Sequence, residues 1–93
     1  MLFRSPKADA IQAISERSEM VIEQGRVSSG SLLAGLALRD AQFPTDSILG
    51  AIRRGEQTIV PRGSTRIMPG DEVVVLTTRE NAAAVHRWLE EHI

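Results

Sequence analysis

Apolar residues gather in short runs that are typical of β-strands. Three such runs span residues 19–23, 57–60 and 72–77, and β-branched side chains are frequent in them. The run at 72–77 contains three consecutive valines followed by Leu76, so it is apolar on both faces. A strand with two apolar faces fits the middle of a sheet, and we therefore expect this strand to be central.

The segment 47–53 is compatible with two structures. Its apolar residues follow helical spacing, and Gly55 would be a suitable helix stop. Gly50 in its interior disfavours a helix by about 1 kcal/mol relative to alanine. The alternative is a strand that turns at residues 54–56 into the run at 57–60. Local periodicity alone favours the helix.

Two segments carry helix-start signals. Ser31 precedes an apolar stretch, which predicts a short helix over Ser31–Leu36. Thr77 with Glu80 three residues later forms a capping box, which predicts a final helix over Arg79–Glu91. The apolar and aromatic residues of that helix share one face, as packing on a sheet requires: Ala82, Val85, Trp88, Leu89 and His92.

These elements predict an α+β fold: a small, mostly antiparallel sheet with a short helix and a C-terminal helix packed on it. Residues 1–18 are expected to form an N-terminal helical arm or linker, since Ser5-Pro6 is suited to a helix start. Residues 19–93 then form the domain proper. Within it, Pro69-Gly70 suits a type II turn.

Composition narrows the functional classes. A chain of 93 residues forms one small domain, which is marginally stable alone and gains from a partner. The formal net charge of −1 argues against nucleic acid as a partner, because that interaction depends on a basic surface. The absence of cysteine excludes disulfides, a thiol nucleophile and cysteine-ligated zinc, and is compatible with a reducing cytoplasm.

No group of residues indicates catalysis. His86 and His92 are six residues apart, about 240° around the predicted helix, so they do not face one site. The serines at 28, 29 and 31 have no accompanying base and suit turns and helix caps. The chain also has no glycine-rich nucleotide motif. We therefore expect no catalytic residue, no metal, no cofactor and no enzymatic activity.

Arginines are the remaining candidates for binding chemistry. Arg39, Arg62 and Arg66 lie in predicted loops or strand ends, and their planar guanidinium groups can bond two phosphate oxygens at once. If the segment 47–53 is a strand, the consecutive side chains of Arg53 and Arg54 would point to opposite faces of the sheet.

The stretch 48–76 resembles the RCK C-terminal (TrkA-C) domain of potassium transport regulators, and the resemblance extends over about residues 19–91. It implies that 47–53 is a strand and that 19–93 is a regulatory domain. The residues that carry it are Ala51-Ile52, Arg54, Gly55, Pro61, Thr65, Ile67, Gly70-Asp71, Val73 and Val75.

The resemblance implies a regulatory ligand-binding and dimerisation module of a potassium or cation transport system. In such regulators two copies pair, and some bind cyclic di-AMP in the groove between them. Leu36-Ala37-Leu38-Arg39 matches part of the pattern, with Arg39 as phosphate clamp. The other implied ligand-binding residues are Leu33, Ala34, Thr45, Ile48, Ile52 and Pro61.

This chain departs from the pattern in the loop 40–47, which is longer and has Thr45 or Asp46 at the amide position. The implied partners are a second copy, a membrane cation transporter or channel subunit, and a small ligand such as a cyclic dinucleotide. The implied location is cytoplasmic, peripheral to the membrane through the transporter.

Two alternatives remain. The stretch 59–75 is superficially similar to the hairpin of swapped-hairpin (AbrB-like) DNA-binding regulators, although the near-neutral charge argues against DNA. The domain could also be an assembly module without a ligand.

Overall fold

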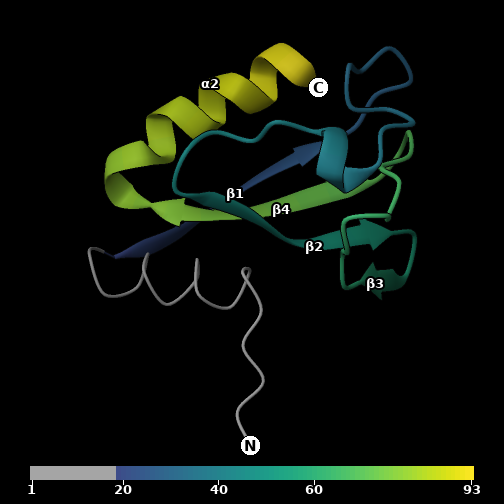
Figure 1. Ribbon diagram of the computed structural model, residues 1–93, viewed down its shortest axis with the longest axis horizontal. Helices are drawn as coiled ribbons and strands as arrows, with labels where there is room; N and C mark the ends of the chain where they lie inside the picture. Colours follow the sequence, from purple (N-terminus) through teal and green to yellow (C-terminus); the bar gives the residue numbers. More distant parts are fainter. Residues whose placement is uncertain (1–18) are drawn as a thin grey trace, which may run out of the picture.

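The computed structural model describes residues 19–93, so the arm expected at 1–18 lies outside the described residues. Four antiparallel strands form one sheet in the order β1-β4-β2-β3, and the α-helix α2 (Ala82–His92) follows the last strand (Figure 1). The predicted α+β fold is confirmed, and β4 is central as expected. The strands are β1 (Met20–Arg26), β2 (Ser47–Arg54), β3 (Gln57–Ile59) and β4 (Glu72–Thr78).

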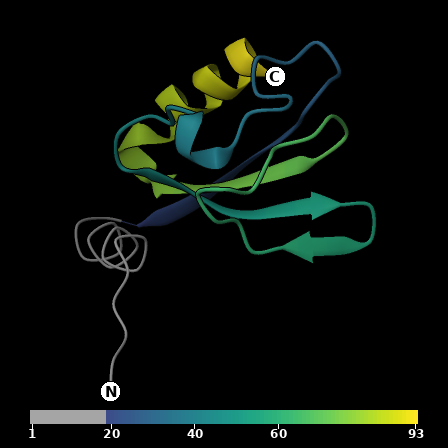
Figure 2. The ribbon, with the colours of Figure 1, turned by 45° about the vertical axis from the view of Figure 1, so that its right-hand side comes forward.

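The sheet has one covered and one open face. Both ribbon views show α2 and the connection 27–46 on the same side of the sheet (Figures 1 and 2). Between them and the sheet lies the core: Val27, Leu33, Leu49, Ile52, Ile67, Val73, Val75, Val85 and Leu89. The opposite face presents the cross-strand neighbours Ile22, Leu76 and Ile48, together with Val74 and Ala51. No element of residues 19–93 covers that face.

The segment 47–53 is a strand, as the family resemblance implied and against its helical spacing. A bulge between Leu49 and Ala51 interrupts its pairing with β4. Gly50 lies at this bulge, where a Cβ atom would come 3.1 Å from Cδ1 of Leu76. Pairing along most of β4 outweighs the local periodicity, and a glycine is what lets β2 approach Leu76 so closely.

Element boundaries differ from those predicted by up to three residues. β1 continues to Arg26 because Gly25 and Arg26 pair with Val73 and Glu72 of β4. Gly25 also leaves room for Ile93, since a Cβ atom there would lie only 2.3 Å from Cδ1 of Ile93. The strand β4 also extends one residue beyond the prediction, so Thr78 and not Thr77 accepts the capping hydrogen bond, from the backbone N–H of Asn81. A 3₁₀ turn, Arg79–Asn81, precedes α2.

The short helix predicted over Ser31–Leu36 is wrong in its extent. The hydroxyl of Ser31 accepts from the N–H of Leu33 as a helix cap would, but only successive turns follow. Gly35 adopts a φ of 85°, and its N–H donates to the carbonyl of Ile67 instead of continuing a helix. The only helical turn of the connection between β1 and β2 is a 3₁₀ turn at Leu38–Asp40.

The strands β3 and β4 do not form a hairpin, because β2 lies between them. This arrangement removes the feature on which the DNA-binding alternative depended. The predicted turn at Pro69-Gly70 is confirmed: Gly70 has a φ of 89°, and the N–H of Asp71 donates to the carbonyl of Met68.

An ion pair closes the end of the sheet next to that turn. Nε and Nη2 of Arg54 donate to the two carboxylate oxygens of Asp71, each at 2.8 Å. The Asp71 side chain is 1 % exposed and also accepts from the N–H of Met68. Its backbone carbonyl accepts from Val27, and Nη2 of Arg54 donates to the carbonyl of Arg66. This clasp, Arg54–Asp71, therefore joins β2, the loop before β4 and the chain after β1.

The clasp should make stability depend on acid pH. Hydrogen bonds from Arg54 hold the pKa of Asp71 below its usual range, although burial opposes the shift. Because the folded-state pKa is depressed, the stabilisation is complete above the unfolded-state pKa of about 3.9 and is lost as pH falls through the lower folded-state value.

We expect Asp71→Asn to lower the free energy of unfolding at pH 7 by about 2–3 kcal/mol. This is less than the loss of a fully buried pair because the Arg54 side chain is 41 % exposed. Urea unfolding at a series of pH values measures it, and the gap between the variant and the original chain should narrow below about pH 4. Arg53→Gln, beside the clasp but 61 % exposed, is the matched control and should cost less than about 0.5 kcal/mol. A gap that stays constant down to pH 2 would contradict the assignment.

Candidate functional site

Two loops pair to form a platform next to β3. The N–H groups of Leu38 and Arg39 donate to the carbonyls of Thr65 and Gly63, and Ala37 forms an isolated bridge with Arg66. The Thr65 hydroxyl accepts from the N–H of Arg62, closing a tight turn at 62–65. The platform therefore consists of residues 35–39 and 62–67, held by backbone contacts.

The platform carries three arginines. Arg66 is committed to structure, because its Nη1 donates to the carbonyl of Gly35 at 2.7 Å. Arg39 and Arg62 are exposed, and no hydrogen bond or ion pair engages their side chains within residues 19–93. Two guanidinium groups without partners on adjacent loops are suited to an anion such as a phosphate.

An apolar depression lies beside the platform, between the connection 27–46 and α2. Its volume is about 280 Å³. Trp88 stacks on His92 with ring centroids 4.2 Å apart, and Phe43 packs on Trp88 at 4.6 Å. The residues that line the depression combine apolar walls with polar groups: Leu32, Leu33, Leu36, Asp40, Ala41, Gln42, Trp88 and His92. Mixed walls of this kind suit a planar heterocycle or an apolar side chain.

The structure separates the residues that the sequence grouped as one site. Leu33 and Ile52 are buried in the core at 1 % and 0 % exposure, and only Leu33 also lines the depression. Ala34 is half-buried next to the depression, and Pro61 is buried just before the platform turn. Arg39 is on the platform itself.

Thr45 and Ile48 lie elsewhere, at the start of β2. Thr45 is exposed, whereas Ile48 pairs with Leu76 on the open face of the sheet. Asp46, the other candidate for the amide position, is engaged: its carboxylate lies 3.5 Å from Nδ2 of Asn81. The side chain of Thr45 has no hydrogen bond within residues 19–93.

Three contributors to the site lie outside the set that the family resemblance implied. Trp88 packs against the core, as predicted for the apolar face of the last helix, and it also lines the depression. Gln42 has no distinguishing pattern, and Arg62 is predicted only as one of several loop arginines suited to phosphate. Only the adjacency of residue 62 to Arg39 through Gly63 would have identified Arg62, and that adjacency is a tertiary contact.

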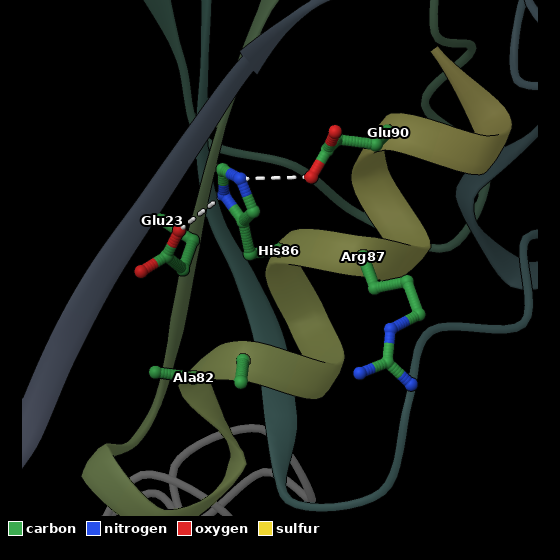
Figure 3. A pocket seen from close by; sticks show the side chains of 6 residues that line it. Glu23, Ala82, His86, Arg87 and Glu90 are labelled. Atoms are coloured by element: carbon green, nitrogen blue, oxygen red, sulfur yellow. Dashed lines mark hydrogen bonds and ion pairs between the residues drawn. The ribbon is translucent and has the colours of Figure 1, made fainter.

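A further depression lies elsewhere, where α2 faces Glu23 of β1. It measures about 670 Å³ and is lined by Glu23, Ala82, Ala83, His86, Arg87 and Glu90 (Figure 3). His86 lies between two carboxylates, with Nδ1 3.2 Å from Glu23 and Nε2 2.9 Å from Glu90. This shallow surface contains one ring bridging two acids, and within residues 19–93 no three acidic or histidine side chains gather to hold a metal.

Comparison with known proteins gives a consistent picture. The family model of the TrkA-C domain matches residues 22–90. The "Trk system potassium uptake protein TrkA homolog 1" of Methanosarcina mazei is 29% identical over 75 residues, which are 81% of this chain and 16% of that protein. The "Trk system potassium uptake protein TrkA homolog" of Archaeoglobus fulgidus is 46% identical over 43 residues, 46% of this chain and 10% of that protein. The chain thus spans less than a fifth of these relatives.

A solved structure described as "Structure of RCK domain with cda" is similar in fold. Its TM-score is 0.61 at 23% identity, and the match covers 77% of this chain and 97% of that one. Within residues 19–93, no helix is long and apolar enough to cross a membrane.

Unfolding experiments can distinguish a core residue such as Leu33 from an exposed candidate ligand contact such as Arg39. We expect Leu33→Ala to lower the free energy of unfolding by about 2–5 kcal/mol, because it leaves a cavity in the core. Arg39→Ala should change it by less than about 0.5 kcal/mol, since the side chain is exposed and has no partner within residues 19–93. Urea unfolding of both variants provides the comparison. Equal losses would place Arg39 among the structural residues.

Proposed function

This chain belongs to the TrkA-C domain family, and on that premise we propose that it is a regulatory module of a potassium or cation transport system. It is not an enzyme. Two copies pair, and the cleft between them binds a small anionic ligand that alters the arrangement of an attached transporter or channel subunit. The module acts in the cytoplasm and reaches the membrane through that partner.

The observation that supports the proposal is the occurrence of free cationic side chains and an apolar depression in the same part of the domain. The side chains of Arg39 and Arg62 have no partners among residues 19–93, and the lining of the depression includes Leu36 of the platform and Asp40, which follows Arg39. A nucleotide has the complementary chemistry: an anionic phosphate and a flat heterocycle. Asp40 and Gln42 at the rim can accept from or donate to the edge of a base.

A cyclic dinucleotide fits a symmetric pair of such sites. It has two phosphates and two bases related by a two-fold axis, so each copy of the chain can bind one half. One copy of this small domain offers only an exposed platform, and pairing would enclose the ligand. We name cyclic di-AMP as the first candidate, because its two phosphates suit the Arg39 side chains of two paired copies and its two adenines suit their apolar depressions.

The departures from the family pattern change which ligand groups the cleft can hydrogen-bond more than they change its ability to bind an anion. Thr45 in the longer loop can donate or accept one hydrogen bond, where an amide would do both through two separate atoms. Asp46 is turned toward Asn81, so it does not place an unpaired carboxylate against a phosphate. The cleft can therefore admit an anion.

Regulation follows if the ligand binds one arrangement of the paired copies more tightly than another. Coupling of this kind is typically about 1–3 kcal/mol, which changes affinity roughly 5–150-fold. An assembly domain without a ligand would give the same fold but no such coupling, and the experiment below separates these two functions.

We expect cyclic di-AMP to raise the melting temperature of the 93-residue chain and to shift its mass in light scattering toward two copies. At 100 times the dissociation constant, ligand binding adds about 2.7 kcal/mol to stability. Arg39→Ala should abolish the shift while leaving the melting temperature without ligand nearly unchanged.

Arg87→Ala is the matched control, because Arg87 is an exposed arginine on the far depression (Figure 3). This variant should retain the full shift. An Arg39→Ala variant that also retains it would exclude Arg39 as the clamp. A chain that responds to no cyclic dinucleotide, mononucleotide or divalent ion, yet pairs, would establish the assembly function instead.

A further inference from the structure

A second cationic cavity lies at the end of the sheet, away from the platform. Three charged residues stand side by side on three adjacent strands: Arg26 on β1, Glu72 on β4 and Arg53 on β2. Their side chains point to the open face, opposite the Arg54–Asp71 clasp. They line a cavity of about 280 Å³ together with Gly55 and Gly70.

The cavity has more positive than negative charge, because Glu72 is its only carboxylate. Within residues 19–93, the side chain of Arg26 takes part in no hydrogen bond or ion pair. Arg53 contacts Glu72 only at 3.5 Å, a distance longer than a good hydrogen bond. Two guanidinium groups against one carboxylate leave one net positive charge. Most of the donors of both arginines are therefore available to a ligand.

The glycines keep the entrance clear. Gly55 and Gly70 occupy the tips of two turns with φ values of 60° and 89°, and a Cβ atom at either would meet nothing within 4 Å. The backbone at both tips therefore leaves space above the arginines. Any other residue would be strained at these angles and would add a side chain at the rim.

The geometry points to a binding site for a phosphoryl group between Arg26 and Arg53, separate from the cleft that Arg39 marks. The arginines stand on strands two positions apart, about 10 Å, since each step between strands is about 4.8 Å. Phosphate has oxygens in several directions, so it can accept from two facing guanidinium forks, whereas a carboxylate presents two oxygens in one plane. Glu72 between them limits affinity and keeps Arg53 oriented.

Inorganic phosphate is the direct probe, added to the 93-residue Arg39→Ala variant so that the other cleft does not contribute. We expect saturable ¹H–¹⁵N shifts at the amides of Gly55 and Gly70, with a dissociation constant on the order of 1 mM. Chloride at equal ionic strength should not produce them. Adenosine monophosphate, titrated in the same way, tests whether a phosphoryl group attached to a nucleoside also binds.

The arginine and glutamate variants should change phosphate affinity in opposite directions. Arg26→Gln and Arg53→Gln should each weaken phosphate binding about tenfold, because each removes one charged donor group. Glu72→Gln should strengthen it about tenfold, an increase that loss of structure cannot produce. Arg79→Gln is the control, because Arg79 pairs with Glu19 at the opposite end of β4, and it should leave the affinity unchanged.

Linear, unsaturated shifts for phosphate and adenosine monophosphate alike, or equal effects of chloride, would overturn the proposal. So would a Glu72→Gln variant that binds no better than the original. These outcomes do not bear on the cleft at Arg39, which is tested by cyclic di-AMP and by a different set of residues.

Discussion

The Arg54–Asp71 clasp is the interaction on which the arrangement of both candidate sites depends. It is a two-point contact between a strand end and a turn, and a carboxylate that is 1 % exposed requires such a partner. Arg54 also holds the carbonyl of Arg66, which belongs to the platform. The same clasp fixes the turn containing Gly70, which borders the second cationic cavity. One ion pair thus contacts both the platform and the turn that borders the second cationic cavity.

Positive and negative side chains of this domain lie in separate places on its surface, which the net charge does not reveal. The formal net charge is only −1, yet arginines without partners among the described residues occur at the platform and at the sheet end. The acidic residues lie partly elsewhere, such as Glu23 and Glu90 on either side of His86. A near-neutral chain is therefore poorly suited to bind nucleic acid, whose affinity depends on many phosphate contacts. It can still bind a single phosphate at a local group of arginines.

Among residues 19–93, no element covers the second face of the sheet. Ile22 is 56 % exposed, and Ile48, Val74 and Leu76 are half-buried without contributing to the core. Monomeric proteins rarely present contiguous apolar surface of this kind. The chain spans less than a fifth of the curated relatives that it matches.

Much of the fold could be predicted from the sequence, and the candidate site only in part. The central position of β4 follows from its unbroken apolar run, and the turn at Pro69-Gly70 follows from two residues with restricted backbones. The strand β2 could not be derived locally, because its spacing is helical and only its pairing with β4 decides the matter. Arg39 was identifiable through a family resemblance. Arg62 was only one of several loop arginines suited to phosphate, since nothing in the residues around position 62 indicates that they lie next to Arg39.

The sequence by itself determined the class of fold, the turn chemistry and the absence of cysteine and of a catalytic motif. These properties depend on composition, hydrophobic period and single-residue backbone preferences, all of which are local. Tertiary structure alone decided that Gly35 ends a helix before it forms, that Leu33 and Ile52 lie in the core, and that Arg26 and Arg53 flank Glu72. Each of these outcomes depends on contacts between residues far apart in the chain, and local preferences contain no information about which distant segments will meet.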